Sequence, residues 1–194
     1  AQVQMNQGRY QEAATSFANA LRYEQESAWL AKWEDLKNFN RSLLFLQQGH
    51  AALEAGNYSA ARQAYQQAQQ AKPDHVDGLI GLANVELAQG NDQAAERLLR
   101  QAQRQQPTNG RLIYTLVGFY RQRSPEQALQ VIDSLPAGTR ASYADLRNSV
   151  VQEQLQAQVD NALEQQDWDR AITLLQQSVR LSPDAPWTTY RLAN

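Results

Sequence analysis

The chain contains no cysteine. That absence excludes disulfide bonds, thiolate zinc sites and catalysis by a thiol, although both reducing and oxidising compartments accept such a chain. No stretch approaches the roughly 18 consecutive apolar residues that a membrane-spanning helix needs. The start of the chain also lacks the order of charged, apolar and small residues that makes a signal peptide. We therefore expect no membrane insertion by this segment.

An excess of basic charge is missing as well. The 18 lysines and arginines are outnumbered by 20 aspartates and glutamates, which gives a formal net charge of −2, and the basic residues are scattered along the chain. A nucleic-acid-binding protein normally gathers its basic residues into a patch or stripe. We therefore expect no nucleic acid among the partners.

Residues that interrupt helices are few. There are six prolines and nine glycines among 194 residues, whereas hydrophobic residues make up 42% and more than two dozen glutamines accompany abundant alanine, leucine and arginine. These abundant residue types favour helices. The composition predicts an all-α fold, and the length fits a solenoid of five or six short repeats.

The sequence repeats itself at an offset of 34 residues. The matching pairs are Gly56 with Gly90, Ala61 with Ala95, Ala68 with Ala102, and Pro73 with Pro107. The small residues allow two antiparallel helices to approach closely. Each glycine is followed by asparagine and is suited to end a first helix, while each proline is suited to stop a second. The period therefore predicts helical hairpins.

This pattern resembles the tetratricopeptide repeat family. One unit supplies the family's key positions as Phe45, Gly49, Ala52, Ala61, Tyr65, Ala68 and Pro73. The next unit supplies Leu79, Leu82, Ala83, Ala95, Leu99, Ala102 and Pro107. The resemblance implies an α-solenoid, a right-handed superhelix of antiparallel helix pairs, here with an extra inserted helix and one lengthened helix.

Two departures from the period lead us to divide the array unevenly. Ala20 and Ala68 are equivalent but lie 48 residues apart, 14 more than the period. Ala128 and Ala171 are also equivalent but lie 43 residues apart, nine more than the period, and we expect residues 142–165 to form one long helix. The chain also begins and ends inside helix pairs, as a fragment of a longer array would. We expect a single array over residues 1–194. Its parts are a partial repeat (1–23), an inserted helix (24–41), two repeats (42–75 and 76–109), a short repeat (110–139), a repeat with a long first helix (140–185) and the start of a further repeat (186–194).

The resemblance also implies a ligand-binding concave face, lined by the first helix of each repeat. Its mixture of aromatic, amide, charged and aliphatic side chains suits a polar polymer or an extended peptide. The alternative is that these are ordinary solvated or inter-helix positions, because every solenoid has a concave face. The candidate binding residues are His50, Glu54, Asp77, Asn84, Arg111, Tyr114 and Arg121.

A second group of candidates is aromatic, and these rings either stack on sugar rings or pack against neighbouring helices. The group comprises Trp29, Trp33, Trp187 and Tyr190. No catalytic residue, metal ligand or cofactor is expected. His50 and His75 have no cysteine or close histidine beside them, and the acidic neighbours Asp167 and Asp169 are typical of a solvated helix surface.

The segment 182–193 reads Ser-Pro-Asp-Ala-Pro-Trp-Thr-Thr-Tyr-Arg-Leu-Ala. It resembles helix starts in the large periplasmic repeat proteins that export bacterial exopolysaccharides, and the Gln-rich hairpins are most similar to repeat regions of bacterial cellulose synthase complexes. The resemblance implies a non-catalytic periplasmic scaffold that links the inner-membrane synthase to the outer-membrane pore. Its implied partners are other subunits of the synthase and export complex and the glucan chain, with the full-length protein attached to the outer membrane.

Two other functions fit the same residues. One is a peptide-binding adaptor for the assembly of a secretion or pilus complex. The other is the substrate-holding arm of an enzyme whose catalytic domain lies elsewhere in a longer chain. The flanking sequence would separate these possibilities, since a glycosyltransferase domain would favour the enzyme.

Overall fold

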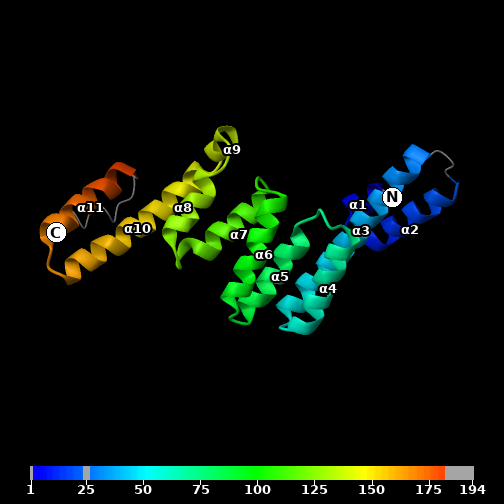
Figure 1. Cartoon of the computed structure of the whole chain (residues 1–194), viewed down its shortest axis with the longest axis horizontal. Coiled ribbons are helices and arrows are strands. Elements are labelled where there is room, and N and C mark those ends of the chain that lie inside the picture. Colours follow the sequence, from blue (N-terminus) through cyan, green and yellow to red (C-terminus); the bar gives the residue numbers. More distant parts are fainter. Residues whose placement is uncertain (1, 24–26, 182–194) are drawn as a thin grey trace. The chain divides into compact units, whose positions relative to one another are not determined.

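The computed structural model describes residues 2–23 and 27–181, and all of its regular structure in these ranges is α-helical (Figure 1). The expected repeat start at 186–194, with Trp187 and Tyr190, lies outside the described residues. The chain divides into two compact units, Ala1–Leu112 and Ile113–Asn194. We describe each unit by itself.

Unit 1 consists of helices paired in chain order. Its helices are α1 (Gln2–Asn6), α2 (Tyr10–Tyr23), α3 (Ser27–Glu54), α4 (Tyr58–Ala71), α5 (Asp77–Ala88), α6 (Asp92–Gln105) and the first residues of α7 (Gly110–Arg121). Contacts join α2 with α3, α3 with α4, α4 with α5, and α5 with α6. The second helices α4 and α6 end just before Pro73 and Pro107, as predicted.

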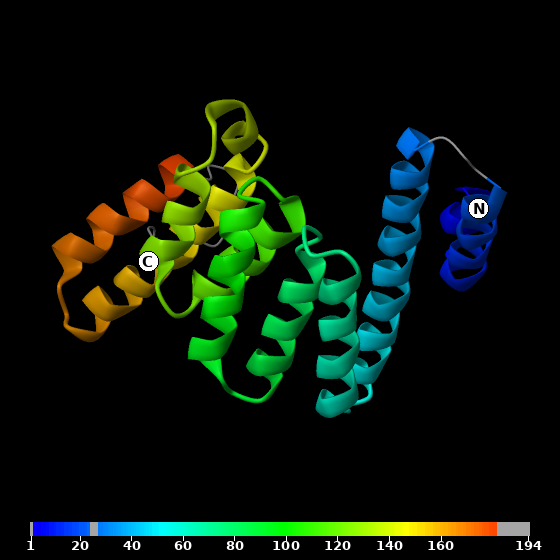
Figure 2. The ribbon, with the colours of Figure 1, turned by 45° about the vertical axis from the view of Figure 1, so that its right-hand side comes forward.

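Helix α3 differs from the expected division of the chain. The segment 24–41 does not end in a boundary of its own, because its described part from Ser27 onward continues into the first helix of the following repeat, up to Glu54. No glycine or proline occurs between Ser27 and Gln48, so nothing in the sequence stops the helix there. The inserted residues therefore lengthen a repeat helix, which packs against both α2 and α4, and α4 is seen beside it in Figure 2.

The turns between paired helices follow one hydrogen-bonding scheme. Gly56 has φ +72°, its N–H donates to the Leu53 carbonyl at 2.9 Å, and the Asn57 N–H donates to the Ala52 carbonyl at 2.8 Å. This arrangement satisfies carbonyls that a helix end otherwise leaves open, and it requires one residue in the left-handed region. Gly90 closes α5 in the same way at φ +78°. Both turns were predicted from the Gly-Asn pairs.

The core of unit 1 is organised around one ring. Tyr65 of α4 is fully buried, and its ring fills the space that Gly49 of α3 and Gly81 of α5 leave open. A Cβ atom added at Gly81 would lie 2.3 Å from the ring, and one at Gly49 would lie 2.6 Å away. The glycines therefore set how closely three successive helices approach.

Unit 2 contains the rest of α7, then α8 (Pro125–Asp133), α9 (Ala137–Ala141), α10 (Ala144–Glu164) and α11 (Trp168–Leu181). The long helix expected over residues 142–165 is α10, and the extra residues before it form the short α9. Leucine, valine and alanine side chains form the core between α10 and α11: Leu155, Val159, Ala162, Ala171, Leu174 and Leu175.

Candidate functional site

Three of the predicted concave-face residues come together in unit 1. His50 belongs to the second half of α3, Asp77 begins α5 and Arg111 lies in the first turn of α7. The Arg111 Nη2 atom is 3.0 Å from His50 Nε2, and Arg111 Nη1 is 3.6 Å from Asp77 Oδ2. One guanidinium therefore connects the first helices of three successive repeats.

These residues line a cavity of about 340 Å³, which we call the His50 pocket. Aliphatic side chains of α3 and the segment just before and at the start of α2 complete its wall. The lining residues are Gly8, Tyr10, Leu43, Leu46, Gln47, His50, Asp77 and Arg111. The pocket thus combines an apolar wall with a histidine, a carboxylate and a guanidinium.

The electrostatics of the pocket follow from its contacts. Burial lowers the pKa of His50, and the nearby Arg111 guanidinium lowers it further. The neutral imidazole can accept the hydrogen bond that Arg111 donates. The pKa of Asp77 is also lowered, first by its hydrogen bond with His75 and then by Arg111. The pocket therefore favours a neutral histidine beside an ionised aspartate.

Buried polar atoms lie next to this network. The Tyr65 hydroxyl and Asp77 Oδ1 are buried without a hydrogen-bond partner in the described part of the chain. The Tyr65 ring meets the His50 imidazole edge-on, with 5.6 Å between the ring centroids, and burial raises the pKa of its phenol. Such unpaired polar groups cost free energy in a folded protein unless water or another group reaches them.

Ser42, His75 and Asp77 form a chain that superficially resembles a catalytic triad. Ser42 Oγ is 3.4 Å from His75 Nδ1, and His75 Nε2 is 3.2 Å from Asp77 Oδ2. However, Ser42 is only 1% exposed, so no substrate carbonyl can approach its hydroxyl. The hydrogen-bonding nitrogens are also exchanged relative to the triad, in which the serine contacts Nε2. These side-chain contacts anchor the His75 loop to α3.

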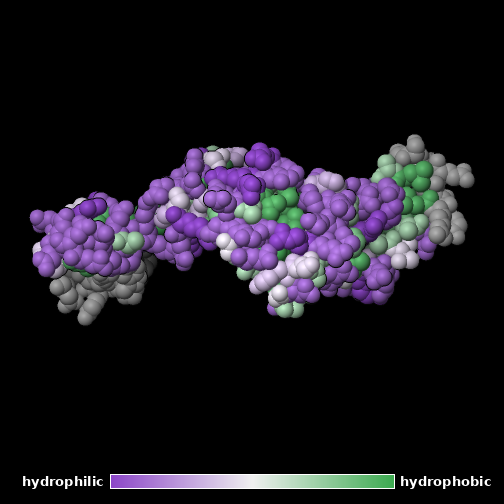
Figure 3. Space-filling view, turned by 60° about the horizontal axis from the view of Figure 1, so that its bottom comes forward, coloured by the Kyte–Doolittle hydropathy of each residue, from purple (hydrophilic) through white to green (hydrophobic). Residues whose placement is uncertain are grey.

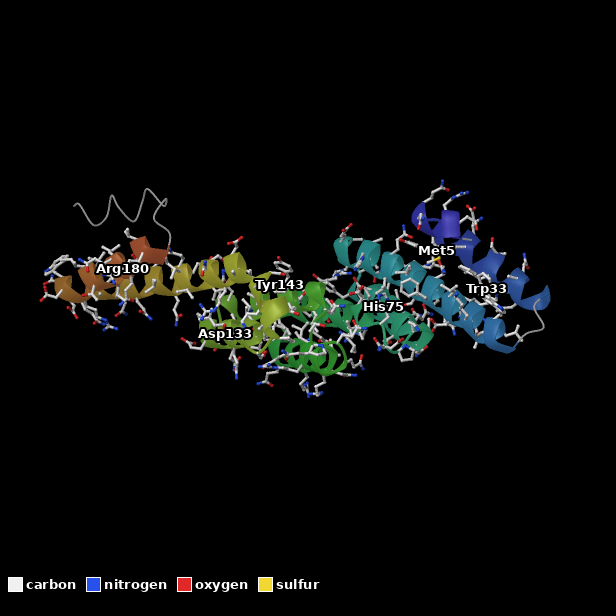
Figure 4. All side chains as sticks on the ribbon, turned by 90° about the horizontal axis from the view of Figure 1, so that it is seen from above. Met5, Trp33, His75, Asp133, Tyr143 and Arg180 are labelled. Carbon is white, nitrogen blue, oxygen red and sulfur yellow. The ribbon has the colours of Figure 1, made fainter. Side chains whose placement is uncertain are left out.

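The other predicted residues of unit 1 lie apart from the His50 pocket. Glu54 is exposed near the end of α3, and Asn84 is half-buried on α5. Trp33 packs on Phe17 of α2 with 5.4 Å between the ring centroids, so it serves the helix interface (Figure 4). Trp29 is 45% exposed and its ring lies 4.9 Å from the Lys32 ammonium. A hydrophobic area covers this end of α2 and α3 (Figure 3).

Tyr114 and Arg121, both on α7, belong to unit 2. Tyr114 is 58% exposed, and its ring centroid lies 5.6 Å from that of Tyr143, just before α10. Arg121 donates to Glu153 Oε2 at 2.5 Å and to Ser149 Oγ at 2.6 Å. Both residues therefore pair with the segment around the long α10.

A second cavity of about 560 Å³ lies in unit 2, and we call it the unit 2 groove. Only Arg121 among its lining residues was predicted. The lining residues are Arg121, Gln122, Pro125, Glu126, Glu153, Gln154, Ala157, Gln158, Asn161 and Arg170. Part of this lining could have been found from the sequence, because Gln154, Gln158 and Asn161 are spaced four and three residues apart and so lie on one face of a helix.

In residues 2–23 and 27–181, no three histidine or acidic side chains are grouped so that they could hold a metal ion. None of the helices in these ranges combines the length and apolar character needed to cross a membrane.

Comparison with known proteins places the repeats in a family. Models described as tetratricopeptide repeat match residues 52–118 and residues 1–34. The crystal structure of MamA protein superimposes with a TM-score of 0.50 at 14% identity, over 78% of this chain and 79% of that one. This similarity concerns the fold alone.

Two curated relatives extend the similarity over nearly the whole chain. Cellulose synthase operon protein C of Salmonella typhimurium (strain LT2) is 34% identical over 177 residues, 91% of this chain and 15% of the relative. The protein of the same name from Escherichia coli (strain K12) is 34% identical over 192 residues, 99% of this chain and 17% of the relative. The chain thus spans about a sixth of these proteins.

Proposed function

Because the chain belongs to the tetratricopeptide repeat family, we propose that it is a non-catalytic scaffold in bacterial cellulose biosynthesis and export. In this proposal it acts in the periplasm, as part of a longer protein that links the inner-membrane synthase to the outer-membrane pore and guides the glucan. Its partners are other subunits of the synthase and export complex.

The observation that carries this proposal is the 34% identity to cellulose synthase operon protein C over 91% of the chain or more. The chemistry of the described sites supports the non-catalytic part. Ser42 is buried, His50 is engaged by Arg111, and the acidic groups of both cavities face arginine or amide partners. These side chains hold helices together, and none is poised to attack a substrate.

The His50 pocket is the proposed docking position for a segment of another subunit. Its wall contains Leu43 and Leu46, against which an apolar side chain packs, while Arg111 offers a guanidinium that is 45% exposed. Arginine beside a small apolar wall is a common anchor of protein interfaces. Replacement of Arg111 by alanine would remove both this anchor and the connection among α3, α5 and α7.

The direct test is made in the bacterium that encodes the protein. Residues 42–181 are deleted in frame from the full-length gene, and cellulose on the cell surface is measured together with glucan synthesis by isolated membranes. We expect surface cellulose to fall to background while the membranes still polymerise glucan. An immunoblot controls for the presence of the shortened protein. Unchanged surface cellulose in cells that contain the shortened protein would contradict the scaffold role.

A peptide-binding adaptor for a secretion or pilus complex is the second candidate, and the combination of aliphatic wall and Arg111 in the His50 pocket favours it. The two roles differ in what co-purifies with the tagged full-length protein. A cellulose scaffold retains synthase subunits, whereas an adaptor retains secretion or pilus components. Loss of the retained protein in an Arg111→Ala variant whose unfolding curve matches that of the wild type would assign the His50 pocket to that partner.

A further inference from the structure

We propose that the unit 2 groove binds a neutral glucan chain through its amide side chains. The inference rests on the proposed role in cellulose biosynthesis for the identity of the sugar, and on the groove itself for the class of ligand. The groove lies among the end of α7, the start of α8, α10 and the start of α11.

Most residues that line the groove carry a polar group, although apolar atoms, including the aliphatic stems of these side chains, form more than half of its exposed surface. Eight of its ten lining residues carry an amide, a carboxylate or a guanidinium, and only Pro125 and Ala157 do not. The surface of α10 and α11 seen in Figure 3 is likewise predominantly hydrophilic. An apolar ligand would therefore remove many polar groups from water without replacing their hydrogen bonds.

The charges of the groove cancel. The lining contains two arginines, Arg121 and Arg170, and two glutamates, Glu126 and Glu153. Arg121 is bonded to Glu153 at 2.5 Å, and the Gln154 amide donates to Glu126 at 2.9 Å. A phosphate or a polyanion would meet both carboxylates, and a cation would meet both guanidiniums. The balance therefore favours a ligand without net charge.

The groove also offers hydrogen-bonding capacity that the protein does not use. The side chains of Gln122, Gln158 and Asn161 make no hydrogen bond to another residue of the described chain, although their neighbours Arg121 and Gln154 do. Each amide presents a carbonyl acceptor and an NH₂ donor. A sugar hydroxyl also both donates and accepts, so rows of hydroxyls complement rows of amides.

A peptide fits this lining less well than a sugar chain. Peptide segments owe most of their affinity to a few aromatic, aliphatic or arginine side chains seated in desolvated pockets. The groove has no aromatic residue in its lining, and its two apolar members are the small side chains of Pro125 and Ala157. Its volume of about 560 Å³ falls in the range of small-molecule sites.

The test is a titration of the chain with cellohexaose, followed by NMR chemical shifts and calorimetry. The decisive variant is Gln158→Ala/Asn161→Ala, and Gln176→Ala/Gln177→Ala on the exposed face of α11 is its matched control. Loss of two amide contacts should weaken binding about tenfold. The control should bind like the wild type. Circular dichroism establishes that both variants remain folded.

Each outcome has one meaning. Saturable, groove-centred binding that the Gln158/Asn161 variant weakens supports the inference. Equal binding by that variant, or no binding of cellohexaose by the wild type, overturns it but leaves the scaffold role intact. Equal affinity for chitohexaose, whose rings carry acetamido groups, means a general glycan groove, which contradicts a glucan-specific site. Tighter binding of a blocked serine-glycine hexapeptide means a peptide groove and also overturns the inference.

Discussion

At the scale of single residues, Tyr65 contacts both the core glycines of unit 1 and a residue of the His50 pocket. Its ring lies against Gly49 and Gly81, and its edge meets His50. A side chain added at either glycine position would therefore disturb both the helix spacing and the pocket wall. Glycine at these positions is a packing requirement, since neither backbone has a positive φ.

The first prediction concerns Gly81→Ala. The added Cβ would lie 2.3 Å from the buried Tyr65 ring, so we expect the variant to lose about 1 to 3 kcal/mol of unfolding free energy through overpacking. Urea unfolding followed by far-UV circular dichroism measures the change. Gly118→Ala is the matched control, because its Cβ meets nothing within 4 Å and alanine favours the helix. A Gly81 variant as stable as the control would contradict this packing.

The second prediction concerns the pH dependence contributed by His50. Its pKa lies below the ordinary value of 6.5 because of burial and Arg111. The unfolded chain therefore binds the proton more readily than the folded one. The stabilisation is complete above the unfolded pKa and is lost as the pH falls through the lowered folded pKa. We expect wild-type stability to fall between about pH 7.5 and about pH 5 by more than that of a His50→Gln variant.

Urea midpoints of both proteins across this pH range test the assignment. Glutamine keeps an acceptor for Arg111 but does not titrate, so the difference between the two proteins isolates the imidazole. Parallel curves would mean that His50 has the same pKa in the folded and unfolded chains.

At the scale of elements, the turn after α10 differs from the other hairpin turns. The Gln166 N–H donates to Leu163 at 3.0 Å, and the Asp167 N–H donates to Ala162 at 2.9 Å, as in the turns at Gly56 and Gly90. Gln166, however, has φ +59° without being glycine. Unit 2 therefore contains a strained residue where unit 1 has glycine.

The third prediction is that Gln166→Gly stabilises the protein by about 1 kcal/mol. Glycine adopts the left-handed conformation without the steric clash of a Cβ atom, and this gain exceeds the entropy it adds to the unfolded chain. Thermal unfolding measures the shift. The neighbouring substitution Gln165→Gly is the control, because Gln165 has φ −81° and glycine there should destabilise. Destabilisation by both substitutions would contradict the strain at Gln166.

The elements also show which parts of the fold were predictable. The Gly-Asn pairs and the prolines end helices through their own conformational preferences, so the turns at Gly56 and Gly90 were predicted correctly. The predicted end of an inserted helix at residue 41 was wrong, because no glycine or proline there stops the helix and α3 continues to Glu54. The positive φ of Gln166 could not be predicted from its residue type, because the packing of α10 against α11 imposes a conformation that glutamine alone does not prefer.

At the scale of the whole molecule, the candidate binding residues belong to two different units of the chain. Asp77 and Arg111 occupy the same repeat position, 34 residues apart, and His50 occupies another position of the predicted concave face. The three side chains do meet, because stacking brings the concave-face positions of successive first helices together. Tyr114 and Arg121 instead pair with Tyr143 and Glu153. The nine-residue lengthening before α11 breaks the period, so repeat equivalence no longer predicts neighbours in unit 2.

The last prediction follows from the distribution of charge over the whole chain. The net charge is −2, no basic patch occurs in the sequence, and the unit 2 groove contains equal numbers of arginine and glutamate residues. Binding of neutral cellohexaose should therefore change by less than about twofold between about 50 mM and about 500 mM NaCl. Calorimetric titration at both salt concentrations measures it, with the uncharged maltohexaose as a control for nonspecific effects of salt on sugars. Affinity that falls steeply with salt would mean that an unbalanced charge drives binding, and the ligand class would then be an ionic one.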